Sequence, residues 1–110
     1  MKDGDKVKVS VGEPWDFSSP EGDNQFSGQI MKMLNSKKGE ALLIKVNKPF
    51  SMSDGLVSYV LAFRRHRTSE WKSVTVCDVP KDVLSRFLST NNADVEGLRN
   101  IIAGSISVIH

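Results

Sequence analysis

The sequence is poor in the residues that build disulfides, metal sites and catalytic pairs. It has one cysteine, Cys77, and two histidines, His66 and His110. One thiol cannot form an internal disulfide or supply the clustered thiolates of a zinc site, and this usage is typical of a reducing compartment. We therefore expect a cytoplasmic protein. Cys77 follows a β-branched alternation and has no basic neighbour, which indicates a packing residue rather than a nucleophile.

Long apolar runs are also missing. The most apolar stretch, residues 101–109, is interrupted by glycine and serine and has about half the length that a membrane-spanning helix needs. The first five residues, MKDGD, lead directly into a polar alternation rather than into the apolar core of a signal peptide. We expect neither a membrane span nor export.

Motifs that carry chemistry are scarce. His66 lies among Arg64, Arg65 and Arg67, and no sequence pattern pairs it with a nucleophile. The acids of the first long loop do not follow the spacing of a calcium loop, and no glycine-rich phosphate loop is present. We expect a protein that is not an enzyme and that holds no cofactor and no metal.

Neither sign of charge dominates, but the charges are segregated. The 15 Lys and Arg residues exceed the 13 Asp and Glu residues by 2, too little to indicate a polyanion partner by itself. Residues 12–31 contain four acids and no base, whereas residues 32–48 and 64–72 are mainly basic. The chain length of 110 residues fits one domain, residues 1–110.

Alternating hydrophobicity predicts strands in the first part of the chain, residues 1–78. Residues 6–11 alternate polar residues with Val7, Val9 and Val11, so these three should face a core. Further strands are expected at 26–34, 41–46, 57–64 and 73–77. The second of these has Leu42, Ile44 and Val46 on one face, the third has Val57, Tyr59, Leu61 and Phe63 on one side, and the last points Val74 and Val76 inward. Gly28 is a possible bulge. Five successive strands indicate a small antiparallel β-barrel or a strongly bent meander.

In residues 79–110 the spacing of apolar residues changes from the alternation of a strand to the period of a helix, so we expect an α+β fold. Pro80 can begin a short helix whose apolar face holds Val83, Leu84, Phe87 and Leu88. A second helix is expected from Asn92 to Gly104, burying Val95, Leu98, Ile101 and Ile102. Residues 105–109 could form a last strand. That strand would either join the sheet beside the first strand or pair with a second copy, giving a dimer.

The strand count and the long first loop resemble, at the level of the fold, five-stranded barrels of the Src-homology-3 type. The peptide-groove residues of that family are not evident, so no function is carried over from it.

The most informative loop, residues 12–24, contains Trp15, Asp16 and Phe17. In an antiparallel meander this loop shares one end with residues 47–55, which contain Phe50 and Met52. Trp15 and Phe17 either bind a partner or fold back to cap the barrel. The leading hypothesis is a non-enzymatic interaction module that binds a protein partner, or its own copy, at this acidic and aromatic end.

The opposite end collects basic residues: Lys37, Lys38, Arg64, Arg65 and Arg67, with Trp71 and Lys72 nearby in the sequence. Such a group could follow a nucleic-acid backbone and stack one base, or it could be a solvated end that discourages edge pairing. A nucleic-acid-binding barrel is therefore the alternative hypothesis.

Overall fold

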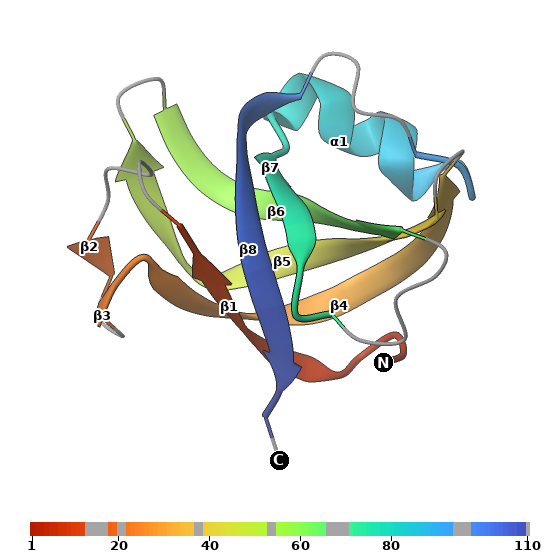
Figure 1. Cartoon of the computed structure of the whole chain (residues 1–110). Helices are drawn as coiled ribbons and strands as arrows, with labels where there is room; N and C mark the ends of the chain where they lie inside the picture. The colour runs from red at the N-terminus through yellow and green to blue at the C-terminus, as the bar shows by residue number, and fades with distance from the viewer. Residues whose placement is uncertain are drawn as a thin grey trace.

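The computed structural model describes residues 1–12, 18–19, 22–36, 39–52, 55–65, 71–93 and 98–109, without the side chains of Ser18, Ser19, Asp23, Arg65 and Arg99. The elements are the strands β1 (Lys6–Val11), β2 (Ser18–Ser19), β3 (Gly22–Asp23), β4 (Gln25–Ser36), β5 (Gly39–Met52), β6 (Gly55–Arg65), β7 (Val74–Asp78) and β8 (Arg99–Val108), and the helix α1 (Lys81–Leu88) (Figure 1).

Six strands form a closed barrel in the order β1-β4-β5-β6-β7-β8, and β2 and β3 form a separate two-stranded sheet. Every neighbouring pair is antiparallel, and β8 closes the barrel by pairing with both β7 and β1. The prediction of a small antiparallel barrel is confirmed. The expected count of five strands is wrong, and the resemblance to Src-homology-3 barrels, which used that count, gains no support.

The alternating positions fill the barrel interior largely as the sequence predicts. Strand β1 has the predicted bounds, and Val7, Val9 and Val11 are buried in the core. The inward positions of β5 and β7 also agree with the prediction: Leu42, Ile44, Val46, Val74 and Val76. Strands β4, β5 and β6 extend beyond the predicted bounds, so the barrel walls are longer than the apolar alternation suggests.

Strand β6 changes the face that points inward. Val57 faces the interior, Val60 and Ala62 do so farther along, and Leu61 belongs to a second cluster outside the barrel. The cause is a register shift between β5 and β6, located between Lys45 and Phe50 on β5. There, residues 46–49 of β5 stand opposite residue 58 of β6 alone, an odd-numbered offset, and an odd offset exchanges the two faces of a strand. Tyr59, Leu61 and Phe63 therefore share one face, at the second cluster, but Val57 lies on the opposite face, so the predicted common face of the four is wrong at Val57.

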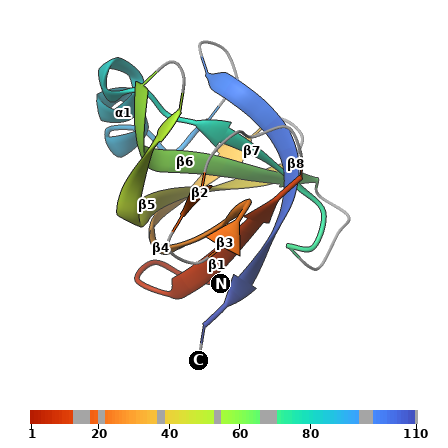
Figure 2. The same cartoon turned by 90° about the vertical axis from the view of Figure 1, so that its left-hand side faces the viewer.

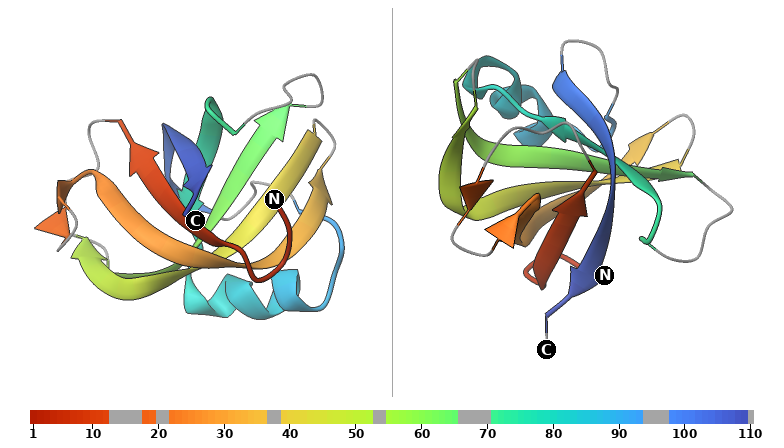
Figure 3. Two further views of the ribbon diagram at one scale, coloured as in Figure 1. Left: turned by 90° about the horizontal axis from the view of Figure 1, so that it is seen from below. Right: turned by 60° about the vertical axis from the view of Figure 1, so that its left-hand side comes forward.

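The helix α1 covers the outer face of β4, β5 and β6, on the side away from β1 and β8 (Figure 3). Its buried Phe87 packs in the second cluster with Leu34, Ala41, Leu43, Leu61, Val79 and Ala93. Leu88, predicted on the same helical face, is 51% exposed. The strands beneath the helix are therefore covered on both faces, which explains why their apolar residues do not alternate strictly.

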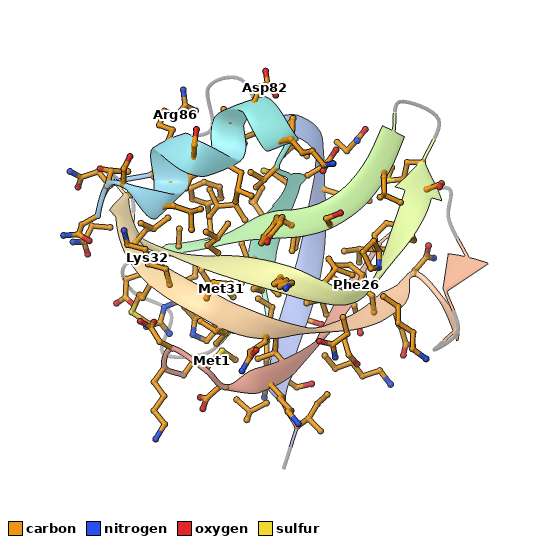
Figure 4. The ribbon with its side chains drawn as sticks, turned by 180° about the vertical axis from the view of Figure 1, so that it is seen from behind. Met1, Phe26, Met31, Lys32, Asp82 and Arg86 are labelled. Atoms are coloured by element: carbon orange, nitrogen blue, oxygen red, sulfur yellow. The ribbon has the colours of Figure 1, made fainter. Side chains whose placement is uncertain are left out.

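Lys32 on β4 joins the barrel to the end of the helix. Its Nζ donates to the carbonyl oxygens of Phe87 at 3.4 Å and Leu88 at 3.3 Å. Figure 4 shows Lys32 below this end of α1, while Asp82 and Arg86 point away from the sheet. A cation at a helix C-terminus interacts favourably with unpaired carbonyls and with the helix dipole.

The second predicted helix is wrong where it overlaps β8, at residues 99–104, and residues 94–97, including Val95, lie outside the described residues. Asn100 has a left-handed φ of 56°, after which Ile102 and Ile106 face the interior and Ile101 is 57% exposed. Gly104, expected to end a helix, instead pairs with Val11 of β1 and Val74 of β7. The chain segment after residue 98 therefore completes the barrel wall.

Among the described residues, no helix combines the length and the apolar character needed to cross a membrane.

Candidate functional site

The barrel has two ends with different residues. At one end, β1 and β5 finish and β4 and β6 begin; we call this the aromatic end. At the other end, β4 and β6 finish and β5 and β7 begin; we call this the basic end. The antiparallel order therefore puts the strand ends before and after residues 12–24 and 53–54 at one end of the barrel, and those before and after residues 37–38 and 66–73 at the other.

The connection between β1 and β4 begins and ends at neighbouring positions on the aromatic end of the barrel. The backbone N–H of Val11 donates to the carbonyl oxygen of Asn24 at 2.9 Å, and Asn24 adopts a left-handed φ of 61°. Between them β2 and β3 pair with each other outside the barrel, as the view onto this end shows (Figure 2). Trp15, Asp16 and Phe17 belong to this connection and lie outside the described residues.

The other residues predicted to bind a partner at this end lie inside the barrel. Phe50 is 6% exposed, and its ring centroid lies 5.2 Å from that of Phe26. Met52 is partly buried and packs against the same core. In this conformation Phe50 contributes to packing and offers little surface to a partner, while a role of Met52 in binding stays a prediction.

At the basic end, Arg64 links two strands and an aromatic ring. Its Nη2 donates to Oε2 of Glu40 at 3.1 Å, across a register pair of β5 and β6. The guanidinium carbon also lies 4.4 Å from the centre of the Trp71 ring, which gives a cation–π contact. Trp71 is 6% exposed, and its carbonyl oxygen accepts a hydrogen bond of 2.7 Å from the N–H of Ile106. Trp71 is thus a buried cap of this end of the barrel.

A hollow of about 440 Å³ lies beside this cap. Its lining includes Met33 of β4, Arg64 of β6, Trp71 and Lys72 before β7, and Ile106 and Val108 of β8. Of the basic residues singled out from the sequence, Arg64 lines the hollow; Lys37, Lys38 and Arg67, and the side chain of Arg65, lie outside the described part.

Sequence reasoning missed Met33, and it placed Ile106 and Val108 on one strand face without linking them to the basic residues. Met33 and Val108 are partly buried and pack against the barrel core. The sequence feature that could have identified Met33 and Val108 is that each is an apolar residue near the end of its strand.

Two titratable residues follow one another at the end of β7. Cys77 is fully buried, and burial, with a smaller effect from the charge of Asp78, raises the pKa of its thiol from 9.0 to about 12. The expectation of a packing cysteine is confirmed. Asp78 is 1% exposed and stands in register with Arg99 of β8. Within the described ranges, no three His, Cys, Asp or Glu residues gather closely enough to hold a metal ion.

Neither a protein-family model, nor a curated protein, nor a solved structure matches this chain. Function is therefore inferred from the two ends of the barrel.

Proposed function

We propose that the chain is a non-enzymatic interaction module that binds a protein partner, or a second copy of itself, at the aromatic end. The observation that carries the proposal is the excursion between Val11 and Asn24, which holds its own β2–β3 sheet outside the closed barrel. Trp15 and Phe17 belong to this excursion. Large aromatic residues that project from a rigid scaffold are typical of binding hot spots.

The packing of the barrel interior supports a binding role over a capping role for Trp15 and Phe17. At the aromatic end the interior already contains the paired rings of Phe26 and Phe50, with Val57 buried beside them in the same cluster. Because protein interiors are close-packed, two further rings would need space that these side chains occupy.

The barrel also limits how a partner can bind. Each of the six barrel strands pairs with a neighbour on both sides, so β-strand addition would require opening the wall. Loops and outer surfaces remain, and the excursion is the longest connection that carries aromatic residues.

The test compares Trp15→Ala and Phe17→Ala with the exposed-leucine control Leu88→Ala. Self-association is measured by light scattering, and partners are compared by cross-linking and mass spectrometry of material bound to each variant. We expect both aromatic variants to lose association while their free energy of unfolding changes by less than about 0.5 kcal/mol. The control Leu88→Ala should retain both the association and the stability of the wild type. A loss of stability of about 3 kcal/mol or more would show that the rings are core caps.

The proposal of a dimer now depends on the aromatic end alone. Of the two outcomes expected for the last strand, the structure shows the first: β8 joins the sheet beside β1 and also pairs with β7, so it is not available as an open strand for a second copy. A chain that stops at Gly104 would lose the pairs of Ser105, Ile106, Ser107 and Val108 with β1. Such a truncation should open the barrel and is no test of dimerisation.

A nucleic-acid-binding barrel is the second candidate, because Arg64 and Lys72 lie at the end where β4 and β6 finish, and Lys37, Lys38, Arg65 and Arg67 lie near the ends of these two strands in the sequence. Trp71 is 6% exposed and its ring lies beneath Arg64, so it offers little surface for stacking a base. Binding would then come from phosphate contacts and should weaken steeply with salt. Retention of oligonucleotides at low salt, lost in the Arg65→Ala/Arg67→Ala variant, would favour this candidate over the first.

A further inference from the structure

We propose that the hollow at the basic end is a binding site for an organic carboxylate with an apolar body, such as an aryl-alkyl or medium-chain acid. This inference does not depend on the proposed partner site, which lies at the opposite end of the barrel.

The hollow has the size of a small-molecule site, and its lining is part apolar and part polar. Its volume of about 440 Å³ falls within the usual range for such pockets. Met33, Ile106 and Val108 line it and belong to, or pack against, the barrel core, so an apolar body placed here would extend that core. Methionine side chains also adapt well to ligands of different shape.

The polar side of the hollow is cationic. Arg64 and Lys72 line it, and the described residues of the lining carry no carboxylate. A small ligand that fills the apolar part and carries a carboxylate can form charge-assisted hydrogen bonds with these cations in addition to the contacts they already make. A neutral ligand of the same shape would lack the charge that strengthens those bonds.

Arg64 is already held in place for this role. Its contacts with Glu40 at 3.1 Å and with the Trp71 ring at 4.4 Å restrain the guanidinium before any ligand arrives. A guanidinium has five N–H donors, and the bond to Glu40 uses one of them. The remaining donors can meet a carboxylate with little further loss of side-chain entropy, which is the advantage of a preorganised site.

The test uses 4-phenylbutyrate and its neutral analogue 4-phenylbutanol. The sequence has two tryptophans, so in the Trp15→Phe variant the fluorescence reports on Trp71 alone. We expect the carboxylate to change this fluorescence on titration and to bind at least tenfold more tightly than the alcohol, with Kd values checked by calorimetry. In the same background Arg64→Met should bring the two affinities to within about twofold of each other.

Matched variants keep the test decisive. Lys48→Met removes an exposed lysine of β5 far from the hollow and should leave the preference unchanged. If Arg64→Met does not fold, Lys72→Met at an exposed position should still reduce the preference for the carboxylate at least threefold, and Val108→Trp should fill the hollow and abolish binding of both probes.

Three results would overturn the proposal: equal affinity for the acid and the alcohol, absence of binding by the acid at millimolar concentration, or an unchanged preference in the folded Arg64 or Lys72 variant. Displacement of 4-phenylbutyrate by a single-stranded oligonucleotide would instead assign this end to nucleic acid. A failure of the Trp15 and Phe17 experiments would leave these measurements unaffected.

Discussion

Gly104 lies so close to Ser10 that a Cβ atom on the glycine would stand 2.6 Å from the carbonyl oxygen of Ser10. The same Cβ would meet Val76 at 3.1 Å and Val11 at 3.3 Å. Gly104 therefore lies where the last strand is inserted between β1 and β7, and its missing side chain leaves room for the Ser10 carbonyl and for the side chains of Val11 and Val76.

Gly104→Ala should destabilise the barrel by about 2–3 kcal/mol, because the new methyl group meets backbone that cannot move without disturbing a strand pair. Gly12→Ala is the control, since its Cβ would lie 3.7 Å from the carbonyl oxygen of Ala103, an ordinary contact distance. Urea denaturation of both variants measures the difference. Equal midpoints would show that the strands at Gly104 have more room than the structure indicates.

Lys32→Met should lower the free energy of unfolding by about 0.5–1 kcal/mol, because it removes the cation from the last carbonyls of α1. Lys45→Met, on the exposed side of β5, should change it much less. The loss at Lys32 should shrink at high salt, which screens interactions between exposed charges. A loss that is independent of salt would mean that packing of the lysine stem is responsible.

Phe87→Ala should cost about 3–4 kcal/mol, because the ring is 1% exposed and fills the second cluster between α1 and the barrel. The neighbouring Leu88, which is 51% exposed, provides the matched control, and Leu88→Ala should stay within about 0.5 kcal/mol. Thermal unfolding followed by circular dichroism would compare them. Similar melting temperatures for the two variants would contradict the docking of the helix through Phe87.

The buried Cys77 should make stability depend on alkaline pH. Its pKa is raised from 9.0 to about 12 in the folded state, so above pH 9 the unfolded chain loses this proton before the folded chain does. Stability should then fall between about pH 9 and pH 12, by up to about 1.4 kcal/mol per pH unit from this group. The slope of wild type minus that of Cys77→Ala isolates the effect. The thiol should also react with a disulfide reagent much more slowly in the folded chain than in denaturant.

Local periodicity was enough to predict most of the strands, because alternation in a segment such as β1 reflects burial of one face. It failed where two faces are buried or where a register shift intervenes. Leu61 and Phe63 face the helix-covered outside of β6 because the pairing with β5 shifts, and nothing in the sequence of β6 alone records the shift.

The prediction for residues 99–104 was wrong for a different reason. The apolar residues Leu98, Ile101 and Ile102 fit a helical period, and Gly104 fits a helix end. The deciding interaction is non-local: both β1 and β7 need a partner, and the segment after Asn100 supplies it. Tertiary pairing overrides local preference in such segments.

For the site at the basic end, the sequence identified Arg64 but not its surroundings. Glu40 and Trp71 lie 24 residues before and 7 residues after Arg64 in the chain, and only the barrel brings all three together. The basic stretch was visible because its residues are consecutive. The hollow could not be predicted from the sequence, because its lining comes from Met1, from β4, β6 and β8, and from the segment before β7.

The pairing of β1 with β8 sets the order in which the chain can complete its structure. Val7 pairs with Val108, a separation of about one hundred residues, so wall closure joins the two most distant strands of the sequence. During synthesis, β1 and β7 would each expose an unpaired edge until β8 emerges, and such edges favour aggregation. Lys6 and Lys8 place two positive charges on β1. During that interval, repulsion between these lysines on two nascent chains would disfavour pairing of their β1 edges. In the closed barrel the same edge is paired with β8, so this effect of the two lysines is confined to the unfinished chain.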